Sequence, residues 1–160
     1  MEKKDRINQF NALIVDDELL NIELAAAFLK EIDNIKVSFA ESGQQAIKGI
    51  YNRSIDLVLL DINMPGMDGF EVCRLLKSDP KTKDIPIIFL TAQNRIEYIT
   101  KAFEVGGVDY INKPFNGEEL KARVRTQLKL RKVMQELKEK QSRLAQLSIA
   151  DPCNKFGKDK

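Results

Sequence analysis

The sequence of 160 residues contains no histidine, no tryptophan and only two cysteines. The absence of histidine excludes serine–histidine and cysteine–histidine catalysis, histidine-ligated metals and a histidine that donates a phosphoryl group. Cys73 and Cys153 lie far apart and form no CxxC pair, so they indicate neither a disulfide framework nor a zinc site. The chemistry open to this chain therefore uses carboxylates, hydroxyls, lysine and a hard metal ion.

Long apolar runs are missing as well. No window approaches the roughly 18 consecutive apolar residues of a transmembrane helix, and the N-terminus leads into no run of the signal-peptide type. We therefore expect a cytoplasmic protein that does not associate with membranes. Hydrophobic residues make up 43% and charged residues 31% of the chain, a balance typical of a globular domain with a substantial core.

The small net charge of +2 conceals opposite charges in two parts of the chain. Residues 1–117 contain 14 basic and 18 acidic residues, a net charge of −4. Residues 118–160 contain 12 basic and 6 acidic residues, a net charge of +6. A basic segment of this kind is most often a solvated helix face, and we favour that interpretation over binding to nucleic acid.

Five short apolar runs recur through the first 112 residues and alternate with segments of helical spacing. Most of these runs are continuous, as in strands that are buried on both faces of a parallel sheet. The pattern predicts an α/β fold with a doubly wound, five-stranded parallel sheet of the (βα)5 type. The predicted strands are Ala12–Val15, Val37–Ala40, Leu57–Leu60, Ile87–Leu90 and Tyr110–Ile111.

Capping residues predict where the helices begin. At four places Ser, Asp or Asn is followed three positions later by Glu or Gln, which is typical of a helix N-terminus. Apolar helix positions such as Phe28, Leu76 and Phe103 are expected in the core. The four capping pairs are Ser42 with Gln45, Asp68 with Glu71, Asn94 with Glu97, and Asn116 with Glu119.

The pattern changes after Leu120, where an extended C-terminal helix is expected. Leu120, Val124 and Leu128 form one face that can pack on the sheet, and no glycine or proline occurs from Glu118 to Asp151. A heptad seam of about two and a half repeats comes next, with Lys140 at one of its positions. Its apolar members are Leu130, Val133, Leu137, Leu144 and Leu147.

These patterns divide the chain into three segments. We expect a globular domain over residues 11–128 and a coiled-coil linker or signalling helix over residues 129–150. Residues 151–160 are polar and begin with Asp151 and Pro152, so we expect the helix to stop there and a disordered tail to complete the chain.

Polar side chains come directly after four of the predicted strands, at the edge where parallel strands end together. Three close carboxylates repel one another unless a cation is present, and oxygen ligands favour a hard ion such as Mg²⁺. A lone aspartate is most often a cap or turn residue, but this coincidence predicts a pocket for phosphoryl transfer to a carboxylate. The residues are Asp16 and Asp17, Asp61, Thr91 and Lys113, with Asp61 as the expected acceptor.

The segments around these positions resemble the receiver domain of two-component response regulators, over Ala12–Arg125. The resemblance implies a flavodoxin-like fold and a partner, either a sensor histidine kinase or a phosphotransfer protein, that phosphorylates Asp61. It also implies a phosphoacceptor signalling domain rather than an enzyme acting on a separate substrate. The matching segments are Leu13–Glu18, Leu59–Gly69, Ile87–Ala92 and Asp109–Phe115.

The resemblance further implies a magnesium site. The ligands would be the carboxylates of Asp17 and Asp61 and the backbone carbonyl of Asn63. Asp16 would assist, either directly or through a water molecule. Asn63 and Gln93 would flank the pocket and tune the hydrolysis of the acyl phosphate.

The remaining roles concern switching. Thr91 and Lys113 would bind the phosphoryl oxygens, and Tyr110 would turn inward when Thr91 moves. The peptide bond between Lys113 and Pro114 would be cis. The face formed by the fourth helix, fifth strand and fifth helix would then change its packing and signal through the C-terminal helix.

Three interpretations of the output remain open. In the first, the receiver regulates an output domain such as a diguanylate cyclase, because Leu147–Pro152 resembles the linker that opens a GGDEF domain, although no GGDEF sequence is present. In the second, a stand-alone response regulator acts through protein partners or as a homodimer. In the third, the basic helix binds nucleic acid or an anionic surface directly.

Overall fold

The computed structural model describes residues 9–150. The chain divides into two compact units, Met1–Leu128 and Lys129–Lys160, and each is considered by itself. Within the described residues, no helix has the length and apolar character needed to cross a membrane.

The first unit is built on one sheet of five parallel strands in the order β2-β1-β3-β4-β5. Each predicted apolar run lies within one strand, so the predicted fold class is confirmed. The chain reverses its direction of travel across the sheet between β1 and β3, which is the position where such sheets bind ligands. The strands are β1 (Phe10–Val15), β2 (Ile35–Ala40), β3 (Leu57–Asp61), β4 (Ile87–Thr91) and β5 (Asp109–Asn112).

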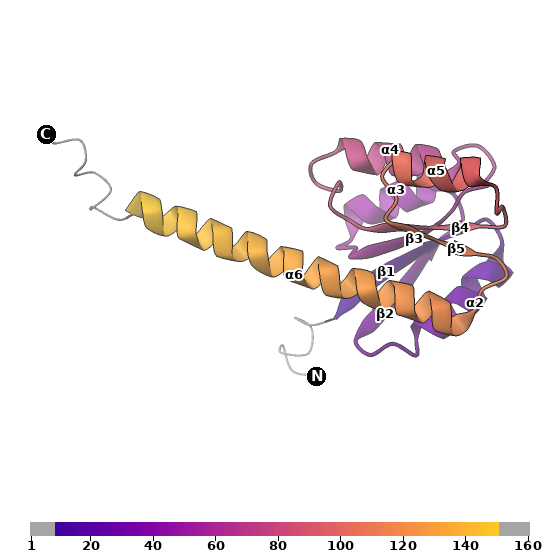
Figure 1. Cartoon of the computed structure of the whole chain (residues 1–160), viewed down its shortest axis with the longest axis horizontal. Helices are drawn as coiled ribbons and strands as arrows, with labels where there is room; N and C mark the ends of the chain where they lie inside the picture. Colours follow the sequence, from indigo (N-terminus) through magenta and orange to yellow (C-terminus); the bar gives the residue numbers. More distant parts are fainter. Residues whose placement is uncertain (1–8, 151–160) are drawn as a thin grey trace, which may run out of the picture. The chain divides into compact units, whose positions relative to one another are not determined.

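Helices cover both faces of the sheet (Figure 1). Three helices, α3, α4 and α5, pack on one face, and α2 packs on the other face beside the first turns of α6. The helices are α2 (Leu19–Leu29), α3 (Gly43–Asn52), α4 (Gly69–Ser78), α5 (Ile96–Glu104) and α6 (Gly117–Ala150).

The two faces of the sheet each bury an apolar layer. Successive strand residues point to opposite faces, so Leu59 joins the layer under α2 and Leu60 joins the layer under α3 and α4. This double burial explains why the runs are continuous rather than alternating. Leu120, Val124 and Leu128 of α6 are buried against the first of these layers, as their spacing predicts.

Three of the four predicted capping residues accept the hydrogen bond expected of them. Ser42, Asp68 and Asn116 each accept from the backbone N–H three residues ahead, at 3.1, 2.9 and 3.0 Å. The prediction at Asn94 is wrong, because α5 begins at Ile96 with Arg95 as its N-cap and without a side-chain cap.

One predicted core residue is also misplaced. Leu76 is fully buried and Phe28 is partly buried, but the Phe103 side chain is 48% exposed. Phe103 lies on α5, where only Ala102 is buried, and its ring meets Tyr110 edge-on at 6.2 Å. The helix therefore turns its smallest apolar residue to the sheet and leaves the phenylalanine at the surface.

The second unit is the outer part of α6. Residues 129–150 continue the helix, and the seam side chains from Leu130 to Leu147 are exposed. The predicted tail, residues 151–160, lies outside the described residues, as does Cys153.

Candidate phosphoacceptor and metal site

Three carboxylates meet at the switch point of the sheet. Asp16 and Asp17 come directly after the last residue of β1, and Asp61 ends β3, the strand hydrogen-bonded to β1. One oxygen from each lies within 4.8 Å of the others. Asp16 and Asp61 are buried and Asp17 is exposed, so the cluster is open to solvent on one side.

Lys113 places its ammonium between the two buried carboxylates. Its Nζ lies 2.8 Å from Oδ2 of Asp16 and 3.0 Å from Oδ1 of Asp61. Burial lowers the pKa of Lys113, but the hydrogen bonds to Asp16 and Asp61 outweigh this effect and raise it above the ordinary value. Lys113 is thus a fixed positive charge, and the Lys113–Pro114 bond beside it is cis.

Asp61 has the most strongly perturbed environment of the pocket. The pKa of Asp61 is raised to about 7, mainly by burial and further by the nearby carboxylate of Asp16. The hydrogen bond from Lys113 opposes the increase only in part. An additional cation at the cluster would favour the ionised form, which is the form that acts as a nucleophile.

Thr91 ends β4 beside this cluster and is 2% exposed. Its hydroxyl oxygen accepts a hydrogen bond from the Gln93 backbone N–H at 2.9 Å and donates to the Gln93 carbonyl at 3.2 Å. The carbonyl of Thr91 accepts from the backbone N–H of Lys113 at 2.8 Å, which fixes the two strand ends together. In this structure the Thr91 hydroxyl is therefore held by the backbone of Gln93, two residues further along the chain.

The loop after Asp61 is shaped by glycine at two positions. Gly66 has a φ of +74°, which L side chains rarely adopt. Gly69 donates to the carbonyl of Ile62 at 2.9 Å, and a Cβ at this position would lie 2.2 Å from the backbone oxygen of Asp61. The close approach holds the start of α4 against the end of β3, while Asn63 remains exposed between them.

Tyr110 is partly buried on β5 and packs against the layer under α3, α4 and α5. Its ring meets Phe103 of α5 at an interplanar angle of 84°. The predicted switching residue thus lies between the sheet and the helix whose packing it would alter.

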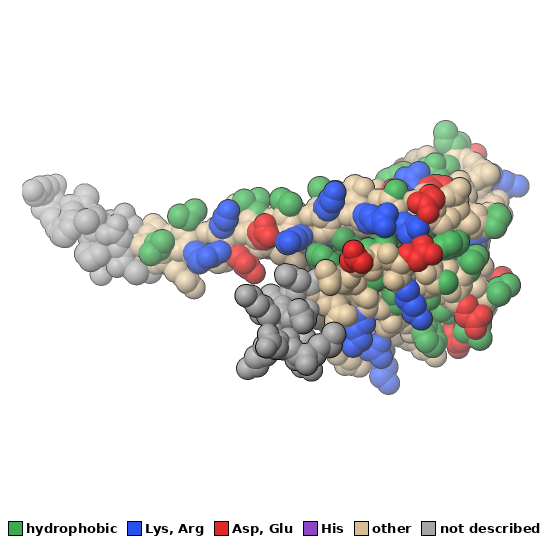
Figure 2. Space-filling view, turned by 90° about the horizontal axis from the view of Figure 1, so that it is seen from below, with side chains coloured by type: hydrophobic (Ala, Val, Ile, Leu, Met, Phe, Trp, Pro, Cys, Tyr) green, Lys and Arg blue, Asp and Glu red, His purple; other side chains and the backbone are tan. Residues whose placement is uncertain are grey.

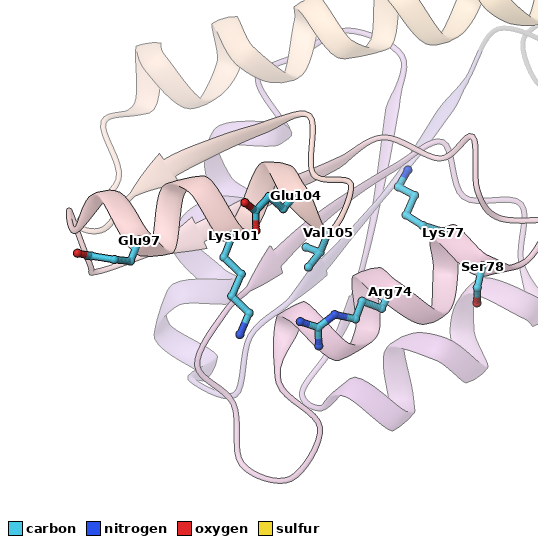
Figure 3. A pocket seen from close by; sticks show the side chains of 7 residues that line it. All are labelled: Arg74, Lys77, Ser78, Glu97, Lys101, Glu104 and Val105. Carbon is cyan, nitrogen blue, oxygen red and sulfur yellow. The ribbon is translucent and has the colours of Figure 1, made fainter.

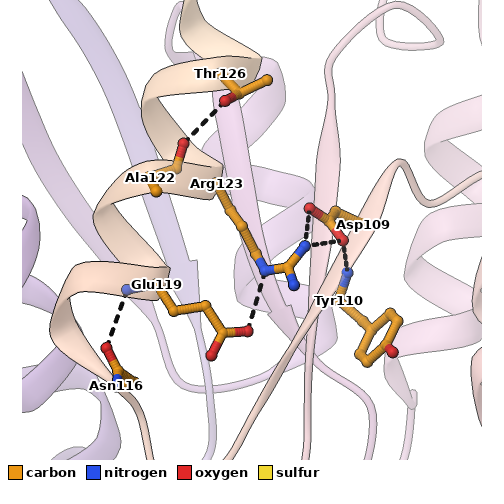
Figure 4. Close-up of polar contacts among 7 residues, drawn as sticks. All are labelled: Asp109, Tyr110, Asn116, Glu119, Ala122, Arg123 and Thr126. Atoms are coloured by element: carbon orange, nitrogen blue, oxygen red, sulfur yellow. Dashed lines mark hydrogen bonds and ion pairs between the residues drawn. The ribbon is translucent and has the colours of Figure 1, made fainter.

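An ionic cluster that the sequence analysis missed links β5 to α6. Arg123 donates to both carboxylate oxygens of Asp109 at 2.8 Å and to Glu119 at 3.1 Å (Figure 4). The pair of Glu119 and Arg123 could have been predicted from the sequence, because residues four apart on a helix lie side by side. The contact of Arg123 with Asp109, which is 14 residues away in the chain, follows from no such local pattern.

A hollow of about 650 Å³ lies between α4 and α5 (Figure 3). Cations and acids both line it, and none of the predicted pocket residues does. Lys77 is one of the lining residues, and its ammonium donates hydrogen bonds to the backbone carbonyls of Lys83 and Ile85, each at 2.8 Å. The residues predicted to carry the chemistry therefore lie at the carboxylate cluster and not in this hollow.

A doubly wound parallel sheet with an acidic, lysine-containing pocket at its carboxyl edge defines a class of phosphoacceptor α/β domains. The response regulator receiver domain model matches residues 12–125, which is more than two thirds of the chain. The chain belongs to the response regulator receiver domain family, and the resemblance of Ala12–Arg125 to that domain is confirmed.

Two curated relatives of this chain are considerably longer proteins. PhoB, the phosphate regulon transcriptional regulatory protein of Pseudomonas aeruginosa, is 45% identical over 117 residues, 73% of this chain and 51% of that protein. The response regulator PleD of Caulobacter vibrioides is 38% identical over 130 residues, 81% of this chain and 28% of that protein. The chain thus spans about half or less of these relatives.

Among solved structures, a putative response regulator from Chloroflexus aurantiacus is similar with a TM-score of 0.72. The two are 37% identical, and the match covers 75% of this chain and 98% of that one. This likeness agrees with the order of strands and helices described above.

Receiver domains bind Mg²⁺ at an acidic cluster, and the residues present here fit that ion. Three carboxylates supply hard oxygen ligands, one side of the cluster is exposed, and two of the carboxylates are buried beside only one ammonium. Such a donor set leaves room for water or phosphoryl oxygens as further ligands.

Proposed function

We propose that the chain accepts a phosphoryl group on Asp61 from a phosphohistidine of a sensor histidine kinase or phosphotransfer protein. The observation that carries this proposal is the ammonium of Lys113, held at 2.8 and 3.0 Å from the two buried carboxylates. A fixed cation beside a buried acceptor carboxylate is suited to a transition state that gathers negative charge on phosphoryl oxygens.

The transfer is a displacement at phosphorus. A carboxylate oxygen of Asp61 forms a bond to phosphorus while the phosphorus–nitrogen bond breaks, and the leaving imidazole retains the bonding electron pair and takes up a proton. The carboxylates of Asp16, Asp17 and Asp61 and the carbonyl of Asn63 would hold Mg²⁺. The ion supplies positive charge toward the phosphoryl oxygens when it is bound.

Switching results from the charge that phosphorylation adds. The phosphoryl group brings about −1.5 to −2 charge and strong acceptor oxygens to Asp61. To donate to them, Thr91 must release the Gln93 carbonyl to which its hydroxyl now donates. Movement of Thr91 opens space for Tyr110 and repacks the face formed by α5, β5 and α6.

The assignment of Asp61 is tested by the substitution Asp61→Asn. A small acyl phosphate and Mg²⁺ are expected to phosphorylate the wild-type chain, and mass spectrometry is expected to find no acyl phosphate on the variant. Asp68→Asn is the matched control, because Asp68 lies in the same loop outside the cluster and asparagine caps a helix equally well. Modification of Asp61→Asn at the wild-type rate would refute the assignment.

For the output, we propose that the outer part of α6 forms a coiled coil with a second copy of the chain and so signals to a downstream domain such as a diguanylate cyclase. The exposed seam from Leu130 to Leu147 supports this proposal. The alternative is a stand-alone regulator acting on protein partners. PhoB, named as a transcriptional regulator, makes a DNA-binding output domain a further candidate.

Two measurements separate these outputs. The reading frame beyond Lys160 identifies any output domain directly. Sedimentation with and without beryllofluoride, which mimics the phosphoryl group, tests dimerisation. A monomer in both states at high concentration would contradict the coiled coil.

A further inference from the structure

The outer part of α6 keeps a broad apolar face at its surface. The side chains of this face are between 48% and 66% exposed. Figure 2 shows hydrophobic side chains along this part of the helix, among basic and acidic ones. The face is wider than one heptad seam, because it includes Met134, which lies next to the seam and is not part of it. The residues are Leu130, Val133, Met134, Leu137, Leu144 and Leu147.

Two heptad seams overlap on this face and share three leucines. Leu130, Leu137 and Leu144 recur every seven residues and can occupy either core position of a heptad, a or d. In register one they occupy a, and Val133, Lys140 and Leu147 fill d. In register two they occupy d, and Met134, Gln141 and Ser148 fill a.

Each register has an advantage and a defect. Register one buries more apolar surface through Val133 and Leu147, but it brings two Lys140 ammonium groups to one layer. Register two buries less apolar surface, yet two Gln141 amides can hydrogen-bond across the layer. Because each gain is offset by a cost, neither register dominates by composition alone.

The face matches a second copy of the same chain. Identical leucines meet in every shared layer when two copies run parallel and in register. The positions that flank the core across such a dimer pair no like charges in either register. Register one pairs Lys129 with Met134, Glu136 with Gln141 and Arg143 with Ser148, while register two pairs Val133 with Lys138 and Lys140 with Ala145.

We propose that this face binds a second copy of the chain in two alternative registers, and that phosphorylation of Asp61 selects between them. The inference rests on the phosphorylation proposed above. Exchange of registers rotates each helix by about 50°, the angle between the a and d positions of a heptad. The helix runs without interruption from Gly117 to Ala150, so a rotation at one end is carried along it.

Single-cysteine cross-linking distinguishes the registers. Val133→Cys occupies a core position only in register one, and Met134→Cys only in register two. Leu137→Cys is the shared positive control, and Ser142→Cys, which faces outward in both registers, is the negative control. Cys153→Ser provides the background, in which Cys73 stays unreactive because burial raises the pKa of its thiol to about 11.

The ratio of disulfide formed at position 133 to that formed at position 134 is the measured quantity. Beryllofluoride is expected to change it by at least about fivefold, the lower end of ordinary coupling between two sites. Two matched substitutions should abolish the change: Lys140→Leu completes the core of register one, and Gln141→Leu completes that of register two. With or without beryllofluoride, Lys140→Leu should keep the ratio in favour of position 133, and Gln141→Leu should keep it in favour of position 134.

The outcomes separate this inference from the proposed function. A dimer whose ratio does not respond to beryllofluoride overturns the two registers and leaves phosphorylation and dimerisation intact. A monomer by sedimentation overturns the registers together with the coiled coil. Phosphorylation of Asp61 is followed by mass in the same samples, so its failure is detected independently.

Discussion

The ionised form of Asp61 is disfavoured by its surroundings in the pocket. Its carboxylate is buried beside a second buried carboxylate, and one ammonium is shared between them. Under the proposed function, Asp61 must be ionised to attack phosphorus, and burial disfavours this ionised form until further positive charge arrives. The binding of a cation would therefore raise the reactivity of Asp61.

The raised pKa of Asp61 predicts how the metal-free protein responds to pH. The folded value, about 7, lies above the unfolded value of 3.8, so the contribution of Asp61 to stability is fully present below 3.8 and is lost as pH rises through about 7. We expect a loss on the order of 4 kcal/mol in the free energy of unfolding, measured by urea titration in a chelator. Asp61→Asn should remove this part of the pH dependence, and an unchanged slope would contradict it.

Added Mg²⁺ should reverse this pH effect. The ion binds ionised carboxylates and competes with the proton on Asp61, so it should raise the melting temperature more at pH 8 than at pH 5. Asp17→Asn tests the site, because Asp17 is the exposed member of the cluster and its loss leaves the core packing unchanged. The variant is expected to need about tenfold more Mg²⁺ for the same shift. An unaltered requirement would exclude Asp17 as a ligand.

At the scale of elements, the start of α4 is the tightest junction near the pocket. Gly69→Ala would place a methyl group 2.2 Å from the backbone oxygen of Asp61, so the loop or the strand must move. We expect a loss of about 2–3 kcal/mol in the free energy of unfolding, together with slower phosphorylation. Denaturant titration and mass spectrometry measure both effects.

Gly49→Ala is the matched control for that substitution. Gly49 lies inside α3, and a Cβ there would meet nothing within 4 Å. Alanine should therefore stabilise the helix by about 0.5–1 kcal/mol and leave phosphorylation unchanged. Equal destabilisation by both substitutions would show that crowding at Asp61 is not the cause.

Helix boundaries show how far local rules extend. Ser42, Asp68 and Asn116 were predicted correctly because an N-cap depends on residues three positions apart. At Asn94 the same pattern failed, since the backbone reaches helical geometry only at Ile96 and Arg95 takes the cap position. The loop from Thr91 is held instead by the contacts of Thr91 with Gln93, which no capping rule describes.

At the scale of the whole molecule, the receiver is a compact unit that ends at Leu128. Leu128 is 5% exposed, whereas Leu130 is 53% exposed. A chain ended after Leu128 should therefore keep its melting temperature within a few degrees, since no core contact is removed. It should be phosphorylated on Asp61 at the wild-type rate and should remain monomeric with beryllofluoride.

Calorimetry, mass spectrometry and sedimentation check these three expectations. A shortened chain that still dimerises would place the interface on the receiver and not on the outer part of α6. Loss of folding would show that the outer part of α6 contributes to the stability of the receiver.

The sequence by itself determined the sheet and the residues at its carboxyl edge. Continuous apolar runs require burial on both faces, and parallel strands bring their ends together, so these two rules were enough to group Asp16, Asp61 and Lys113. The same reasoning identified the outer helix through its seven-residue repeat. These predictions were possible because they depend on how apolar residues repeat along the chain, which the sequence contains directly.

Only the tertiary structure decided what the grouped residues do to one another. Asp61 and Lys113 are 52 positions apart, and their 3.0 Å contact depends on how two strands and a loop are packed. The exposure of Phe103 and the pairing of Arg123 with Asp109 depend in the same way on neighbours from other elements. Burial and ionic contacts are set by distances in space, which the order of residues along a chain does not contain.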